Sequence, residues 1–69
     1  MTRIDIVYDG HPYSTGTDNF SDLKARILDA ATGGTPFWLT VNEGAGTVKA
    51  VDLLITSHSQ ISVAEIIPD

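Results

Sequence analysis

Serine, histidine and carboxylate side chains are the residues of this chain that would suit nucleophilic catalysis. Ser57, His58 and Ser59 follow one another, and any aspartate would complete a Ser-His-Asp set on paper. A catalytic triad needs side chains that converge in space beside an oxyanion donor, and adjacency in sequence does not supply that geometry. The chain also lacks a strand–Gly-x-Ser-x-Gly–helix elbow. We therefore expect His58 to be an exposed turn residue and the protein not to be an enzyme, with no catalytic residue.

Residues 43–49 have the glycines, the hydroxyl and the lysine of a phosphate-binding loop. Such a loop also needs a Gly-Lys-Ser/Thr ending and a helix after it, because these aim backbone amides and the lysine at the phosphates. That ending is absent, no helical pattern follows, and an acid, Glu43, opens the segment. The pattern favours a hairpin turn over a nucleotide site.

Two histidines and the absence of cysteine limit the metal chemistry of this chain. Without cysteine there is no disulfide and no thiolate-bound zinc. His11 and His58 would have to meet across a sheet and recruit Asp5 or Asp9, and a lone histidine pair makes a poor metal cage. Residues 18–22 carry oxygen ligands but lack the loop glycine and terminal glutamate of an EF-hand, so helix capping explains them better. We expect no metal and no cofactor.

Aromatic side chains are the remaining candidates, and they would bind a partner instead of reacting. Tyrosine and tryptophan are over-represented at binding hot spots. Tyr8 and Tyr13, with His11 between them, are candidates to line one face of a hairpin, and alternation points Trp38 away from the core. The alternative is that the tyrosines cover the end of the core and that Trp38 packs on a neighbouring strand.

The elements that would position these residues begin with a hairpin. Residues 3–8 alternate between apolar and polar, which is the period of a half-buried strand. Asp9-Gly10 is a strong two-residue turn signal, and residues 11–15 would return as the second strand. Pro12 cannot donate a backbone hydrogen bond, so we expect this second strand at a sheet edge. The register would pair Tyr8 with His11, Ile6 with Tyr13, and Ile4 with Thr15.

One helix is predicted over residues 20–31, where apolar residues recur on one helical face. Asp18 or Ser21 would cap its start, and the glycines at 33–34 would end it. Strands are expected over 37–42, 47–51 and 60–67, with a turn at 43–46. Residues 52–56 are apolar on both parities, so that run is either buried on both sides or contains a bulge.

These elements predict one α+β domain over residues 1–69, with the order β-β-α-β-β-β. One helix packed on a mostly antiparallel sheet of four to five strands buries both apolar faces. The second face of the sheet is left to solvent or to a partner, and it should carry Val7 and Trp38. If such residues are contiguous, they form an exposed apolar patch of the kind that marks interfaces.

Charge and hydropathy limit the classes of partner that this protein could bind. The net charge is −5, and the four basic side chains are scattered along the chain. Binding to a phosphate backbone needs clustered Lys and Arg, so we expect neither a nucleic-acid nor a membrane partner. No apolar run approaches the ~20 residues that cross a bilayer, and acids stand where a signal peptide would have its apolar core. We expect a cytoplasmic protein.

Three segments, residues 4–10, 36–42 and 53–56, together resemble small proteins of actinobacteria and their phages. The resemblance covers most of the chain and implies a bacterial or phage origin. It implies no particular activity, cofactor or catalytic residue.

We therefore expect a non-catalytic protein-interaction module that binds a protein partner, including itself as a dimer. The surface would be a strand edge or the face bearing Trp38. An edge strand is a template for another chain, and residues 60–67 carry one charge, Glu65, to protect them. Two alternatives remain. One is a small-ligand or metal-binding domain at the end of the first hairpin that uses Tyr8, His11 and Tyr13, with or without His58. The other is a phage-encoded accessory protein that binds a host protein through its acidic face.

Overall fold

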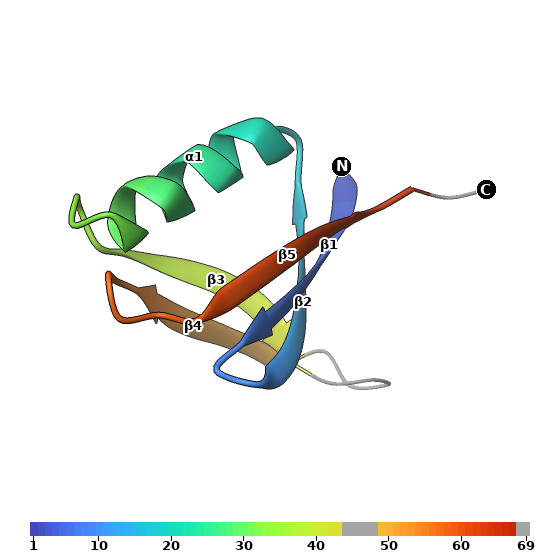
Figure 1. The fold of residues 1–69 in the computed structure, drawn as a ribbon. Coiled ribbons are helices and arrows are strands. Elements are labelled where there is room, and N and C mark those ends of the chain that lie inside the picture. Colours follow the sequence, from blue (N-terminus) through green and yellow to red (C-terminus); the bar gives the residue numbers. More distant parts are fainter. Residues whose placement is uncertain (44–48, 68–69) are drawn as a thin grey trace.

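A computed structural model describes residues 1–43 and 49–67, which form one helix and five strands. The elements are β1 (Thr2–Tyr8), β2 (His11–Thr17), α1 (Phe20–Ala31), β3 (Phe37–Glu43), β4 (Lys49–Ile55) and β5 (Ile61–Ile66). The predicted α+β class and the order β-β-α-β-β-β are confirmed (Figure 1). The predicted turn at 43–46 and the start of the next strand lie largely outside the described residues.

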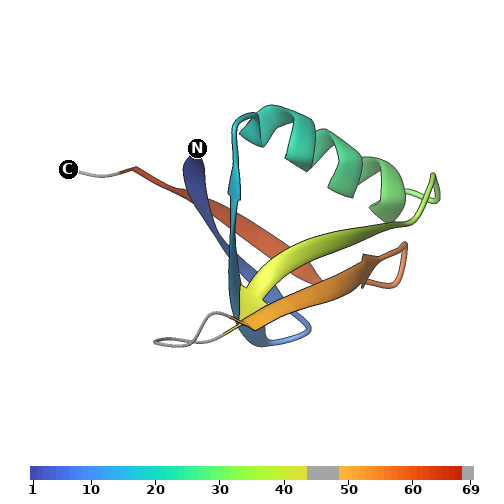
Figure 2. The same cartoon turned by 180° about the vertical axis from the view of Figure 1, so that it is seen from behind.

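The five strands form one antiparallel sheet in the order β4-β3-β2-β1-β5. The helix lies over one face of this sheet, here called the inner face, and leaves the opposite outer face uncovered (Figure 2). β4 and β5 are consecutive in the chain but stand at opposite edges of the sheet. Within the described residues, each edge strand therefore pairs with a single neighbour.

The first hairpin has the predicted register, with Tyr8 opposite His11, Ile6 opposite Tyr13 and Ile4 opposite Thr15. Asp9 has φ 49° and Gly10 has φ 84°. Positive φ at both central residues is what a two-residue turn between twisted strands requires. The turn chemistry of two residues thus fixes the faces of both strands.

The prediction that the second strand lies at a sheet edge is wrong, because β2 stands in the middle of the sheet. Pro12 is tolerated there for a local reason. Among the described residues, β3 pairs with β2 at Tyr13 and Ser14, so Pro12 has no pairing partner on the described part of β3. Pro12 has no N–H to donate, and on the other side it stands opposite Val7, next to the hydrogen-bonded pair Tyr8–His11 that closes the turn. The pair of Val7 with Pro12 is therefore not a hydrogen-bonded one, and the proline costs the described ladder no bond.

The helix has the predicted bounds, but its cap differs. Asn19, not Asp18 or Ser21, is the N-cap, and its side chain accepts a hydrogen bond of 2.9 Å from the Asp22 N–H. All three are capping residue types, but Asn19 is the one immediately before the first helical residue, with extended backbone. At the other end Gly33, at φ 91°, ends the helix in the left-handed conformation as predicted.

The core lies between the helix and the inner face of the sheet. Its buried residues are Ile4, Ile6, Leu23, Ile27, Ala30, Leu39, Val41, Leu53 and Ile55. The run 52–56 is neither buried on both sides nor bulged, since β4 pairs with β3 without interruption. Leu53 and Ile55 face the core, whereas Leu54 faces outward. Within the described ranges, no helix is long and apolar enough to span a membrane.

Candidate protein-interaction surfaces

Trp38 lies on the outer face, as alternation predicted, and Leu54 stands directly opposite it on β4. Trp38 is 64% exposed and Leu54 is 41% exposed, although both are large apolar side chains. The next outward pair along these strands is polar, since the Thr40 hydroxyl donates to the Asp52 carboxylate at 2.7 Å. We call the two apolar residues the Trp38–Leu54 pair. The sequence analysis did not single out Leu54 as a candidate binding residue. The apolar residues at both odd and even positions of 52–56 indicated that one of them would face outward.

Val7 is also exposed on the outer face, at 45%, but it does not join the Trp38–Leu54 pair. Val7 is opposite Pro12 at the hairpin end of β2, while β3 meets β2 where Asn42 pairs with Ser14. Trp38 is four residues before Asn42, or roughly 13 Å along the strand at about 3.3 Å per residue. Val7 and the Trp38–Leu54 pair therefore form two separate spots on the outer face and not one contiguous patch.

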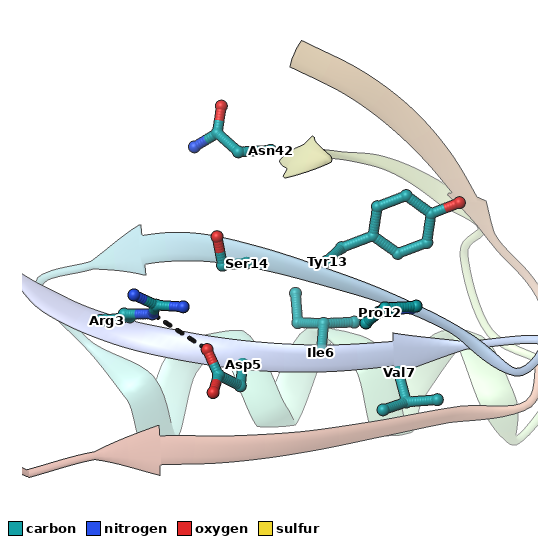
Figure 3. A pocket seen from close by; sticks show the side chains of 8 residues that line it. All are labelled: Arg3, Asp5, Ile6, Val7, Pro12, Tyr13, Ser14 and Asn42. Atoms are coloured by element: carbon teal, nitrogen blue, oxygen red, sulfur yellow. Dashed lines mark hydrogen bonds and ion pairs between the residues drawn. The ribbon is translucent and has the colours of Figure 1, made fainter. Parts of the chain in front are cut away.

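A shallow hollow of about 370 Å³ lies on the sheet beside the first hairpin (Figure 3). It is lined by Arg3, Asp5, Ile6, Val7, Pro12, Tyr13, Ser14 and Asn42. Its two charged side chains already pair with each other, the guanidinium Nε of Arg3 donating to Asp5 at 3.0 Å. In the part of the chain that is described, no buried side-chain polar atom lacks a hydrogen-bond partner. The hollow thus offers a ligand no buried, unpaired polar group.

Tyr8 serves the fold. Its hydroxyl donates to the Leu54 carbonyl oxygen at 2.6 Å and lies 3.3 Å from the Ser59 hydroxyl. Ser59 in turn accepts a hydrogen bond from the Thr56 N–H at 2.9 Å. Tyr8 therefore fastens the end of β1 to β4 and to the turn at 56–60. This is the role foreseen by the alternative in which the tyrosines cover the end of the core.

His11 and Tyr13 share the inner face of the hairpin with Tyr8, as their register requires. Tyr13 is half-buried and packs against the core, while His11 is exposed. Among residues 1–43 and 49–67, no three His, Cys, Asp or Glu side chains come close enough together to hold a metal ion. The structure thus brings the three hairpin candidates onto one face but gives the two tyrosines packing roles.

The serines and histidine at 57–59 form the turn between β4 and β5. His58 is an exposed turn residue, as predicted, and its backbone N–H donates to the Thr56 hydroxyl at 3.0 Å. The Ser59 hydroxyl is engaged with Thr56 and with the Leu54 carbonyl. These contacts stabilise the turn. The phosphate-loop pattern falls mainly on residues 44–48, outside the described residues.

The four basic side chains each lie against a partner within the chain. Arg3 pairs with Asp5, and Lys49 lies 3.8 Å from Glu43. The Arg26 guanidinium stands 4.3 Å from the centre of the Phe37 ring, and the Lys24 ammonium stands 4.7 Å from that of Phe20. The cations are therefore distributed over β1, α1 and β4 instead of forming a basic cluster.

β5 is an edge strand, and the side of it that faces away from β1 is here called its free side. One hydrogen bond shows which backbone groups of β5 point to that side. The Asp9 N–H donates to the Gln60 carbonyl at 2.9 Å, in line with the register that places Tyr8 opposite Ile61. Backbone groups in an antiparallel pair alternate between the partner strand and the other side. The residues whose backbone groups bond to β1 are Ser62, Ala64 and Ile66. The residues whose N–H and C=O groups point to the free side are Ile61, Val63 and Glu65.

The opposite edge of the sheet, β4, is partly closed. The Leu54 carbonyl points away from β3 and accepts from the hydroxyls of both Tyr8 and Ser59. Two charged residues, Lys49 and Asp52, also lie on β4, whereas β5 carries Glu65 as its one charge. Charges and covered backbone groups are the usual protections of an edge strand. β5 is thus the less protected of the two edges.

Comparison with protein-family models, with curated proteins and with solved structures found no match for this chain. The resemblance to small actinobacterial and phage proteins stays a prediction. Inference about function therefore starts from the Trp38–Leu54 pair and the free side of β5.

Proposed function

We propose that the protein is a non-catalytic protein-interaction module that self-associates through β5. The observation that carries this proposal is the row of outward backbone donors and acceptors on Ile61, Val63 and Glu65, with one charge among them. Such a row is a template for an added strand, and strand addition is a common mode of protein recognition.

The side chains of β5 also favour a partner. Ile61 and Val63 face the inner side but are only half-buried. β5 extends away from the helix toward the C-terminal end (Figure 1), and a described strand pairs with it on one side, β1. Ile66 and Ile67 are exposed as well. A strand added beside β5 would remove part of the surface of Ile61, Val63 and Ile66 from water, and burial of apolar surface is the main favourable term in association.

The small size of the domain points in the same direction. A chain of 69 residues without cysteine has a thin core and no disulfide. Small domains commonly compensate with disulfides, metals or self-association. Pairing with a second copy would lengthen the sheet and add buried apolar contacts beside the existing core.

Light scattering over a concentration series tests the proposal. The expected result is a mass that rises from 7.4 kDa toward twice that value as concentration increases. A single six-residue strand pair buries less than the roughly 1,200–2,000 Å² of a standard interface, so we expect a reversible, concentration-dependent dimer. A mass that stays at one chain up to millimolar concentration would refute self-association.

A second candidate function is the capture of a different protein by the Trp38–Leu54 pair. The observation that favours it is the 64% exposure of the sole tryptophan beside another exposed apolar side chain. Tryptophan is the residue type most enriched in binding hot spots, together with Tyr and Arg. This reading predicts that Trp38→Ala abolishes the capture and leaves the mass of the β5 dimer unchanged.

A further inference from the structure

We propose that two copies pair antiparallel along β5, with Val63 of one copy opposite Val63 of the other. This inference rests on the self-association proposed above and specifies its register. In Figure 3, β5 is the reddish strand below β1, and its free side is the one away from β1, where no described strand pairs. The residues whose backbone N–H and C=O groups point to this free side are spaced evenly about Val63, with Ile61 before it and Glu65 after it. A two-fold axis through Val63 therefore makes this edge complementary to itself.

Hydrogen bonding selects this register. With Val63 at the centre, Ile61 faces Glu65 of the second copy, so every outward N–H and C=O of both strands finds a partner. A register centred on Ala64 would place Ile61 opposite Ile67, which lies past the end of β5. A register centred on Ser62 would place Glu65 opposite Ser59, whose N–H already donates to the Thr56 carbonyl at 3.2 Å. Both shifts leave outward groups of β5 without ladder partners.

Charge selects the same register. In the pairing centred on Val63, the two Glu65 residues are four positions apart, or about 13 Å along the strand. That separation exceeds the Debye length of about 8 Å at physiological ionic strength, so their repulsion is screened. Centring on Ala64 brings the two carboxylates to diagonal positions about 7–8 Å apart, and centring on Glu65 places them directly opposite, where like charges destabilise a sheet.

The register also fixes the shape of the dimer. Opposed residues of an antiparallel ladder place their side chains on the same face of the sheet. Both helices would therefore lie over one face of a continuous sheet that joins the two copies edge to edge. The two uncovered outer faces would lie on the other side, each with its Trp38–Leu54 pair on β3 and β4, at the opposite end of the strand order from β5.

Cysteine cross-linking tests the register, because the chain contains no cysteine of its own. In the proposed pairing Ser62 is opposite Ala64 of the second copy, at a pair that is not hydrogen-bonded, with Cα atoms about 4.5 Å apart. That distance permits a disulfide, which requires Cα atoms about 4.4–6.8 Å apart. Ser62→Cys and Ala64→Cys proteins are mixed in equal amounts and oxidised with glutathione disulfide. Intact mass spectrometry then separates the mixed dimer from the two homodimers.

The expected result is a mixed dimer that forms several-fold faster than either homodimer. Both positions are exposed, so neither substitution threatens the fold. Ala50→Cys, exposed on the other edge strand, measures the rate of random collision. Faster cross-linking of Ser62→Cys or Ala64→Cys with itself would overturn the register and leave self-association standing. A dimer by light scattering that cross-links no faster than Ala50→Cys would move the interface away from β5. A monomer at every concentration would overturn the proposed function together with this inference.

Discussion

Tyr8 and Leu54, 46 positions apart in the chain, are joined by a hydrogen bond of 2.6 Å from the tyrosine hydroxyl to the leucine carbonyl oxygen. This bond holds the end of β1 against β4 and the turn that leads to β5. It also occupies a carbonyl on the otherwise open side of β4. The same contact thus stabilises the fold and leaves β5 as the less protected edge.

Tyr8→Phe should lower the stability of the fold by about 1 kcal/mol, because a half-buried hydroxyl and its carbonyl partner lose their bond. In a domain of this size that corresponds to a fall in Tm of about 4–8 °C, measured by circular dichroism. Tyr13→Phe is the matched control, since within the described residues the Tyr13 hydroxyl makes no hydrogen bond. Equal melting temperatures for the two variants would show that the Tyr8 bond contributes nothing.

Val63→Lys should reduce dimer formation at least tenfold, because the proposed register brings the two lysines directly opposite each other at the two-fold axis. Ala64→Lys is the control on the same strand, since its side chain lies on the outer face opposite Ser62 of the second copy. Sedimentation velocity gives the dissociation constants, and circular dichroism checks that both variants are folded. If the two lysine variants dimerise equally well, Val63 does not lie at the centre of the interface.

Salt should strengthen the dimer. Each copy has a net charge of −5, so two copies repel each other at long range. Raising the ionic strength from 0.01 M to 0.15 M shortens the Debye length from about 30 Å to about 8 Å and screens that repulsion. Light scattering at the two ionic strengths should give a lower dissociation constant at the higher one. A dimer that salt weakens would instead be held by ion pairs.

Asn19→Ala should destabilise the protein by about 1 kcal/mol, because the Asp22 N–H loses its capping acceptor. Ser21→Ala is the matched control in the first turn, where the structure assigns the serine no capping bond. Urea denaturation followed by circular dichroism measures both. A larger loss for Ser21→Ala than for Asn19→Ala would contradict the observed cap.

The first hairpin and the helix were predictable because their signals are local. Asp9 and Gly10 set a turn that fixes the register of both strands, and Gly33 ends the helix at the predicted place. The choice of Asn19 as the cap was harder, since three capping residue types stand within four positions. A shift of one residue at a helix start does not alter the hydrophobic pattern that predicts the helix.

The order of the strands was not predictable, because it depends on contacts between distant segments. Pro12 argued for an edge, yet β5 pairs with the far side of β1 and β3 pairs with β2. Tyr8 resembled a binding residue because its hydrogen-bond acceptor, Leu54, lies near the other end of the sequence. Ile61 and Val63 were not among the candidate site residues of the sequence analysis. The single charge in residues 60–67 nevertheless indicated that this strand was poorly protected as an edge.

Hydrogen exchange of the β5 amides, followed by NMR at low and high protein concentration, tests the central claim most directly. The amides of Ser62, Ala64 and Ile66 bond to β1 and should be protected at both concentrations. The amides of Ile61, Val63 and Glu65 point to the free side, so their protection should appear only as the dimer forms. That alternating gain along one strand is the predicted result. A doubling of mass without added protection at these three residues would place the interface elsewhere.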